Sequence, residues 1–537
     1  MATIPWGVIY TGVAGYSVFI SSFSTFFVLS VIVTALKVLY SFVLYPDYLT
    51  PIKHIPTPPD RSWLKGNTDT YVIQTPFEDM LKWTKTVPNS GLLRYYVVGN
   101  MERVLVTTPK AMSELLVQNA YEFEKPEMMR RSLGRIAGKH GVLLVEGQEH
   151  KRHRKNLMPA FSYRHIKDLY PTFWSKSVEM VKCIEQDLQA RGSADDNVVE
   201  VRPWASRATL DIIGLAGMDQ DFGSLADPKN EIAEQYHRIL QDPPLWLKLL
   251  FAAAFVLGRG NIIQALPIQR NRDLMDGCEY IRGVAQRLIS EKKNRVKHNP
   301  DEVESGKDIL SVALRSGTFT DEELIDQMMT FLAAGHETTS TALQWSIYTL
   351  CKHQDVQTRL REEIRSNLPP ISVQNPEPIT AVTLDSLPYL HAVCNEVLRF
   401  HPSVPITFRD TPNDTTLAGT HIAKGTMLTI SPEVINHHPD FWGPDAGKFN
   451  PERWLGAGQA NNGGASNNYA FMTFLHGPRG CIGQGFAKSE LACLVAATVG
   501  RFHMELKDPN AKLKVKRSAT VSPLDGVLAK FTPIEGW

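Results

Sequence analysis

The chain has 537 residues, 43% of them hydrophobic, and a formal net charge of +1. A chain of this length can bury a sizeable core, and its balanced charge requires no acidic partner in bulk. The spacing C-x-x-C, which would favour a zinc site, does not occur, and a disulfide scaffold is not indicated by the six cysteines, Cys183, Cys278, Cys351, Cys394, Cys481 and Cys493.

The N-terminal segment is predicted to enter a membrane. No charged side chain precedes Lys37, and the apolar run 8–36 is long enough to cross a bilayer. No basic region or small-residue cleavage site accompanies the run, which favours an uncleaved anchor, and the lysines and arginines after it place the body in the cytoplasm. We expect residues 1–45 to form a single-pass anchor, with a hairpin of two short segments as the alternative. Residues 46–66 contain five prolines and are predicted to be a stiff linker.

The body, residues 67–537, is predicted to be mainly helical with a small β region. Residues 92–98 and 103–107 alternate like a β-hairpin around Gly99-Asn100, and helical patterns then dominate to about Phe400. The apolar segment 245–257 is too short to span a bilayer, and either core packing or insertion into the membrane surface would explain it. The low-complexity stretch 456–468 is predicted to be a mobile loop. No internal repeat and no nucleic-acid motif is present.

A long helix is predicted from about Asp321 to His353, and Thr320 and Glu323 have capping-box spacing at its start. Its middle reads AGHETT, residues 334–339, with Ala334 and Thr338 on one face and His336 on another. Small residues at 334 and 335 leave room for a flat cofactor or a diatomic ligand. An acid next to an alcohol in mid-helix can disturb the backbone hydrogen bonds and hold water. A Thr-rich core helix without chemistry is the alternative.

Two basic or paired segments are ambiguous taken alone. Glu396 and Arg399 lie three apart on a predicted helix, which usually indicates a surface pair. The stretch 147–155 is strongly basic, as expected of a solvated helix face. The basic stretch could instead form a clamp for a cofactor carboxylate.

The most informative segment is residues 474–483, FLHGPRGCIG, which places Cys481 on a tight turn before an apolar helix. Exposed N–H groups at a helix N-terminus favour a thiolate, which can ligate iron, and Arg479 can answer a ligand carboxylate. Gly477, Gly480 and Gly483 are expected to adopt backbone conformations that bulkier residues avoid. A buried free cysteine beside a glycine-rich turn is the alternative.

The pattern F-x-x-G-x-R-x-C-x-G resembles the haem-binding loop of the cytochrome P450 monooxygenases, and the resemblance extends from about residue 67 to the end. It implies haem b, with Cys481 as the axial ligand of the iron. The residues implied to lie around the haem are Phe474, Gly477, Gly483 and Ala334. Those implied to hold its propionates are Arg479, Arg154, His150 and Arg409, with His150 standing where the family has tryptophan. Glu337 and Thr338 would relay protons, while Glu396, Arg399 and Arg453 would form a structural network.

The resemblance also implies O2 as a substrate and an external electron donor, because the sequence has no flavin or nicotinamide fingerprint. The implied donor is a membrane-bound NADPH–cytochrome P450 reductase, with cytochrome b5 as a second candidate, docking on Lys151, Arg152 and Lys155. The implied location is the endoplasmic reticulum membrane. The pattern favours a lipophilic secondary metabolite as substrate, such as a terpenoid, alkaloid or polyketide. The alternatives are a fatty-acid hydroxylase, an oxygen-independent isomerase or dehydratase, and a haem-carrying or gas-sensing protein.

Overall fold

The computed structural model describes residues 4, 6–19, 23–62, 65–67, 76–191, 197–244, 246–250, 266–299, 306–372, 379–517 and 520–537. These residues fall into two compact units, which are described separately. One unit comprises described residues of Met1–Glu114, Trp246–Ile263 and Arg409–Ile430, and the other comprises those of Leu115–Leu245, Gln264–Phe408 and Ser431–Trp537.

The first unit contains the N-terminal helices and most of the main β-sheet. Its helices are α1 (Trp6–Phe19), α2 (Phe23–Leu39), the π-helix Tyr40–Leu49, α3 (Pro76–Thr86) and α4 (Pro109–Ser113). Its strands are β1 (Leu92–Val97), β2 (Met101–Val106), β5 (Thr415–Leu417), β6 (Thr420–Ile422), β7 (Met427–Ile430) and the last two residues of β4 (Thr407–Asp410). The main sheet has the order β1-β2-β7-β4, with β1 and β2 antiparallel and β2 and β7 parallel.

The predicted β-hairpin is confirmed. β1 pairs with β2 from Leu92 opposite Val106 to Val97 opposite Met101. Gly99 and Asn100 occupy the turn with φ of 79° and 54°, a left-handed backbone that glycine and asparagine tolerate best.

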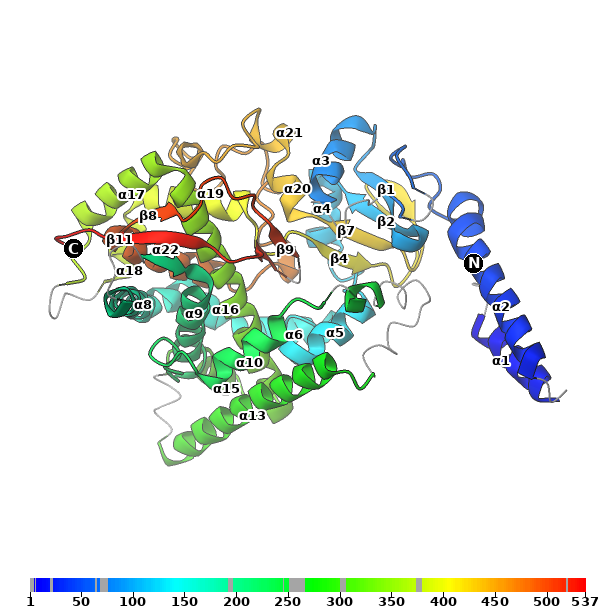
Figure 1. The fold of residues 1–537 in the computed structure, drawn as a ribbon, viewed down its shortest axis with the longest axis horizontal. Helices are drawn as coiled ribbons and strands as arrows, with labels where there is room; N and C mark the ends of the chain where they lie inside the picture. The colour runs from blue at the N-terminus through cyan, green and yellow to red at the C-terminus, as the bar shows by residue number, and fades with distance from the viewer. Residues whose placement is uncertain are drawn as a thin grey trace. The chain divides into compact units, whose positions relative to one another are not determined.

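Two helices, α1 and α2, cover the predicted anchor and lie side by side (Figure 1), where the hydroxyls of Tyr10 and Thr34 form a hydrogen bond of 2.8 Å. Among the described residues, one helix is long and apolar enough to cross a membrane, judged by length and composition alone. It covers Phe23–Leu49 and is mostly exposed. The candidate span therefore lies further along the chain than the predicted run 8–36.

The segment after the anchor packs against the sheet of its own unit. Ile52 and Ile55 are buried. The Asn100 side chain donates to the Phe42 carbonyl at 2.8 Å, and the Tyr96 hydroxyl donates to the Pro46 carbonyl at 3.2 Å. The proline-rich stretch is thus held by contacts and does not act as a free spacer. Of the predicted apolar segment 245–257, only 246–250 is described; it is helical, with Trp246 exposed.

The second unit is mainly helical. Its longer helices are α5 (Glu127–Ala137), α6 (Gly147–Leu157), α8 (Tyr170–Arg191), α9 (Val201–Met218), α10 (Glu231–Leu240), α13 (Gln269–His298), α16 (Asp321–Lys352), α17 (Gln354–Asn367), α19 (Pro388–Phe400) and α22 (Gln484–Arg501). Its shorter helices are α7 (Tyr163–Ile166), α15 (Ile309–Arg315), α18 (Ala381–Asp385), α20 (Pro432–Asn436) and α21 (Pro439–Trp442). Its strands are β3 (Val198–Glu200), β8 (Phe502–Leu506), β9 (Val515–Arg517), β10 (Val521–Pro523) and β11 (Leu528–Pro533).

Helix α16 is the central element of this unit. It packs against α9, α5, α13, α22 and α19, and Figure 1 shows it crossing the bundle with α9 beside it. The predicted capping box is confirmed at its start: Glu323 N–H donates to the Thr320 hydroxyl, and Thr320 N–H donates to the Glu323 carboxylate. The apolar core of the unit surrounds this helix.

The small sheets of this unit are antiparallel. They have the orders β3-β11-β8 and β9-β10. The low-complexity stretch 456–468 is not free of contacts: Gly463 lies against the rings of Trp442 and Trp454, and Ser466 N–H donates to the Phe441 carbonyl at 2.9 Å.

Candidate functional site

The loop before α22 places Cys481 at the start of that helix. The Cys481 N–H donates to the Phe474 carbonyl at 2.8 Å, and the Gly480 N–H donates to the Gly477 carbonyl at 3.0 Å, which closes the turn. Helix α22 begins at Gln484, directly after Gly483. The prediction of a cysteine just before a helix N-terminus is confirmed.

The glycines of this loop differ in what they allow. Gly477 has φ of 75°, and a Cβ atom there would lie 2.0 Å from the Leu116 carbonyl oxygen, so no larger residue fits. Gly480 and Gly483 have φ of −67° and −88°, which any residue adopts. The expectation of a special backbone conformation is therefore correct for Gly477 and wrong for the other two.

The Cys481 thiol lies in an unusual environment. Of the six cysteines it is the one with an exposed side chain. Protein nevertheless encloses the sulfur, so that burial raises the pKa of the Cys481 thiol, while a hydrogen bond from the Gly483 N–H and the charge of Arg154 lower it. A side chain that is accessible and yet enclosed by protein borders a space within the fold.

The middle of helix α16 is likewise partly accessible although its surroundings are buried. Residues 324–332 and 339–347 are buried, whereas Ala334, Glu337 and Thr338 are partly accessible. Phe161 connects this stretch to the cysteine loop, because its ring packs on Phe331 at 5.5 Å between centroids and is the group nearest a Cβ atom built on Gly483. The structure thus brings the two strongest sequence motifs to one region.

The side chains of the AGHETT stretch have separate partners. The Thr338 hydroxyl donates to the Ala334 carbonyl at 2.9 Å, and a Glu337 oxygen accepts from the Thr520 hydroxyl at 2.9 Å. Gly335 serves helix packing, since a Cβ atom there would lie 2.9 Å from a side-chain carbon of Ile213 in α9. The prediction that the small residue at 335 leaves room for a ligand is therefore wrong; its space is occupied by α9.

His336 faces away from the accessible side of α16, as predicted. It is fully buried, its ring packs on Tyr236 at 4.5 Å between centroids, and its Nδ1 lies 2.6 Å from the Leu332 carbonyl oxygen. Burial lowers the pKa of His336, so the ring is neutral and acts as a packed core residue.

Helix α6 carries the basic residues of the expected cofactor site. Arg154 donates to the Gly480 carbonyl at 2.6 Å, which places its charge beside the cysteine loop. His150 is buried and its Nδ1 lies 3.0 Å from the Tyr121 hydroxyl. Burial, with the nearby charges of Lys125 and Arg479, lowers the pKa of His150 to about 3. The imidazole is therefore neutral and can donate one hydrogen bond, as tryptophan would.

Arg479 is buried and held by its own unit. It donates to the Phe123 carbonyl at 2.5 Å and to the Ala120 carbonyl at 3.3 Å, and it forms an ion pair with Glu146. Its Nε has no hydrogen-bond partner among the described residues, which leaves a buried donor for a ligand carboxylate. Arg409 is buried in β4 and belongs to the other compact unit, so its role as a propionate ligand stays a prediction.

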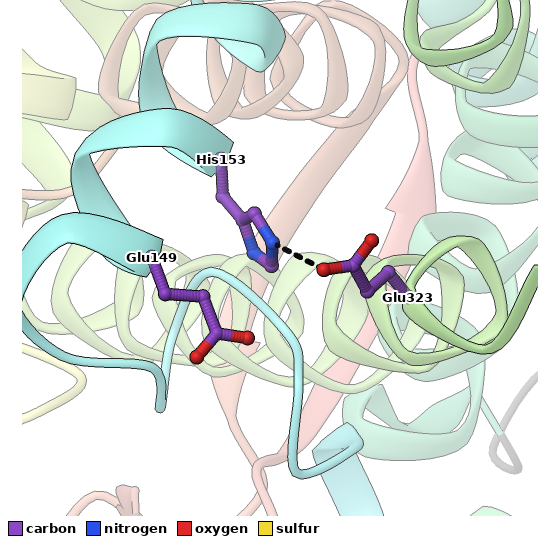
Figure 2. Close-up of side chains that lie close together, drawn as sticks. All are labelled: Glu149, His153 and Glu323. Carbon is purple, nitrogen blue, oxygen red and sulfur yellow. Dashed lines mark hydrogen bonds and ion pairs between the residues drawn. The ribbon is translucent and has the colours of Figure 1, made fainter. Parts of the chain in front are cut away.

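Sequence reasoning did not identify the cluster of Glu149, His153 and Glu323. Figure 2 shows Glu149 and His153 on α6 and Glu323 on α16, with the His153 ring directed toward the Glu323 carboxylate at 3.2 Å. The Gln327 amide nitrogen lies 3.0 Å from His153 Nδ1, and His153 Nε2 lies 2.9 Å from an Arg152 guanidinium nitrogen as well as 3.2 Å from the Glu323 oxygen.

This cluster holds α6 against α16. Arg152 pairs with the same Glu323 carboxylate and donates to the Thr318 carbonyl at 2.9 Å. Burial opposes ionisation of Glu323, but the hydrogen bonds from Arg152, Thr320 and His153 lower its pKa to about 2. Arg152 supplies the positive charge that a cation would bring, so the cluster is an ion-paired contact between helices. Arg152 is thereby engaged within the fold, whereas Lys151 and Lys155 are exposed.

The Glu396 network lies beneath the cysteine loop. The Glu396 carboxylate accepts from both Arg399 and Arg453, and Glu396 and Arg399 have fully buried side chains. Asn436 links this network to the loop, because its side chain donates to the Arg399 carbonyl and accepts from the Met472 N–H at 2.8 Å. The predicted structural role of this pair is thus visible in the structure, and Asn436 is a member that sequence spacing gave no sign of.

These residues fit a haem. A thiol at a helix N-terminus suits an iron ligand, a neutral imidazole and two guanidinium groups suit carboxylates, and the small Ala334 is partly accessible on α16. The donor set contains no second soft ligand near Cys481 among the described residues, which would have favoured a cluster or a zinc site.

Comparison with known proteins agrees with this geometry. The cytochrome P450 family model matches residues 56–529. The chain is 57% identical to cytochrome P450 monooxygenase sphH of Aspergillus fumigatus, covering 96% of this chain and 95% of that protein. It is 39% identical to cytochrome P450 monooxygenase FSL4 of Gibberella zeae, covering 93% and 91%, and 37% identical to cytochrome P450 monooxygenase ALT8 of Alternaria alternata, covering 92% of each. The chain therefore belongs to the cytochrome P450 family and is a haem-iron monooxygenase.

Proposed function

We propose that this monooxygenase is anchored in the endoplasmic reticulum membrane and inserts one oxygen atom from O2 into a lipophilic secondary metabolite. The observation that carries the proposal is the Cys481 thiol, accessible and enclosed, at the start of α22. The fungal source of the similar monooxygenases supports a metabolite of the terpenoid, alkaloid or polyketide classes. The exposed apolar helix Phe23–Leu49 supports the anchor.

The proposed cofactor is haem b. Cys481 would ligate the iron, with Phe474, Gly477, Gly483 and Ala334 around the ring, and its propionates would be held by His150, Arg154, Arg479 and Arg409. A thiolate-bound haem supplies the activation of O2, which no side chain of the chain can provide. The Gly483 N–H and the Arg154 charge stabilise the thiolate form of Cys481.

The protein's own contribution to the reaction is proton delivery and the exclusion of water. We assign the Glu337 carboxyl group as the proton donor and Thr338 Oγ1 as the atom that accepts the proton. The Thr338 hydroxyl already donates to the Ala334 carbonyl, so its oxygen is oriented with lone pairs free to accept. Burial of α16 on both sides of this stretch limits the access of bulk water.

The electron donor in this proposal is the NADPH–cytochrome P450 reductase, with cytochrome b5 as a second candidate. Lys151 and Lys155 of α6 are exposed and can attract an acidic partner, whereas Arg152 is bound to Glu323. The body of the enzyme would face the cytoplasm, since the basic residues follow the anchor.

The first experiment tests the iron ligand. Cys481→His or Cys481→Ala should abolish the strongly red-shifted Soret band of the reduced carbon monoxide complex. The matched control is Cys493→Ala, because Cys493 is fully buried in α22 and lies away from the loop. Retention of the band together with activity in the Cys481 variants would show that the proposal is wrong.

The second experiment tests the proton path. Microsomes containing the reductase would receive NADPH, O2 and a fungal metabolite extract, and products would be detected by the mass of one added oxygen atom. Thr338→Ala should continue to consume NADPH but release peroxide, and loss of a positioned acid–base group typically costs about 10²–10⁴-fold in rate. The double variant with Thr339→Ala excludes a substitute hydroxyl. An unchanged ratio of product to NADPH would favour the oxygen-independent alternative.

A further inference from the structure

The C-terminal hairpin β9–β10 contacts the proposed proton donor. Thr520, directly before β10, is buried, and its hydroxyl donates to a Glu337 carboxylate oxygen at 2.9 Å. On β9, burial lowers the pKa of Lys516, and the charge of Glu337 opposes that effect. Lys516 also donates to the Leu240 carbonyl at 2.5 Å. Two side chains of one hairpin therefore act on Glu337.

The position of Thr520 relative to α16 is fixed by three further hydrogen bonds. The Val521 N–H donates to the Ser403 carbonyl at 2.9 Å, and the Ser403 hydroxyl donates to the Thr338 carbonyl at 2.9 Å. On its other side, the Val521 carbonyl accepts from the Trp345 indole at 2.8 Å. The residue after Thr520 is thus connected to α16 at two positions, at Thr338 through Ser403 and directly at Trp345.

The structure leaves Glu337 few other restraints. Its side chain is partly accessible, and among the described residues no hydrogen bond is found between it and Thr338, whose hydroxyl donates to the Ala334 carbonyl. A glutamate has three rotatable side-chain bonds, so its carboxylate takes one orientation only where a partner holds it. Thr520 is the hydrogen-bond donor found here.

We propose that Thr520 is a positioning residue for proton delivery: its hydroxyl selects the Glu337 rotamer from which the carboxyl group donates a proton to Thr338. The proposal rests on the proposed function of Glu337. A hydrogen bond to a charged acceptor is worth enough to shift a rotamer population about tenfold. The C-terminal hairpin would thereby set the efficiency of proton delivery without contacting the reacting atoms.

The test compares Thr520→Val with Thr520→Ser in the full-length holoenzyme. Valine keeps the shape of threonine and removes the hydroxyl, whereas serine keeps the hydroxyl. In the microsomal assay with the metabolite extract, Thr520→Val should raise the peroxide released per NADPH severalfold, and Thr520→Ser should restore the wild-type ratio. The matched control is Ser522→Ala, since Ser522 is a buried residue of β10 and the hydrogen bonds found among the described residues do not join its hydroxyl to Glu337.

A second readout does not depend on turnover. The infrared carboxylate band of Glu337, isolated by subtracting the spectrum of Glu337→Gln, should shift in Thr520→Val and stay unchanged in Thr520→Ser and Ser522→Ala. An unshifted band in Thr520→Val would overturn the proposal, as would a wild-type peroxide ratio in that variant.

Failure of the proposed function is distinguishable from failure of this inference. If Glu337→Gln keeps the wild-type peroxide ratio, Glu337 does not deliver protons, and the roles of both Glu337 and Thr520 are refuted. If Glu337→Gln releases peroxide while Thr520→Val does not, only the role of Thr520 is refuted. The double variant should be no worse than Glu337→Gln alone, because both changes act on one group.

Discussion

Replacement of Glu396 by glutamine removes the charge at the centre of the buried network beneath the cysteine loop. One carboxylate oxygen accepts from Arg399 Nη2, Arg453 Nε and the Asn450 N–H at 2.7, 3.1 and 2.8 Å. The other accepts from Arg399 Nε and the Trp454 indole at 2.8 and 2.9 Å. Every one of these contacts needs an acceptor, and both side chains of the Glu396–Arg399 pair are 0% exposed.

Glutamine offers one acceptor oxygen and one NH2 group, so at least two buried donors lose their partner whichever way the amide is turned. Each unsatisfied buried donor costs about 1–3 kcal/mol, and removal of one partner from a buried ion pair costs about 3–5 kcal/mol in total. Arg453 keeps its pair with Asp445 at 2.9 Å, and Arg399 keeps three backbone carbonyls, which argues for the lower half of that range.

The assay is urea unfolding of the holoenzyme, followed by loss of the Soret band and by tryptophan fluorescence. For a slope of about 2–3 kcal/mol per M, the midpoint should fall by about 1–2 M. The matched control is Glu452→Gln, which changes the neighbour of Arg453 in the short helical turn Pro451–Trp454. Glu452 pairs with Arg359, and because these side chains are 54% and 52% exposed the pair should contribute less than about 1 kcal/mol. A midpoint for Glu396→Gln equal to that of the control would refute the reasoning.

Three further outcomes are expected. Gly477→Ala should lose haem and release it faster, because the new methyl group clashes with a backbone carbonyl, whereas Gly483→Ala should retain haem; equal haem content in the two variants would contradict the geometry. Burial lowers the pKa of His401 to about 3, below its ordinary 6.5, so the unfolded chain binds a proton first and stability falls as the pH drops from about 6.5 toward 3, by about 1.4 kcal/mol per pH unit for this group. His401→Phe should flatten that dependence in urea titrations, and an unchanged slope would exclude His401 as its source. Deletion of residues 1–39 should release the enzyme from membranes with its haem content unchanged. Deletion of 1–45 also removes the Phe42 carbonyl that accepts from Asn100, and should lower the free energy of unfolding by about 1–3 kcal/mol. Loss of haem in the shorter deletion would contradict an anchoring role.

The sequence by itself determined those caps, turns and loops of this protein that form between residues near one another in the chain. The capping box of α16 joins residues three apart, the β1–β2 hairpin turns on Gly99-Asn100, and the cysteine loop closes between Phe474 and Cys481. In each case the partners belong to one short continuous stretch of the chain, so spacing and residue type are sufficient to predict them. The same holds for the helical course of the AGHETT stretch.

Only the tertiary structure decided which distant groups meet. Gly335 looks like space for a ligand until Ile213 of α9 occupies it, and Arg152 looks like a free surface charge until Glu323 of α16 pairs with it. The contact of Thr520 with Glu337 spans 183 positions of the chain and has no counterpart in any local pattern. Such contacts depend on how helices and hairpins pack, because burial and close approach are set by the whole fold and not by the spacing of residues along the chain.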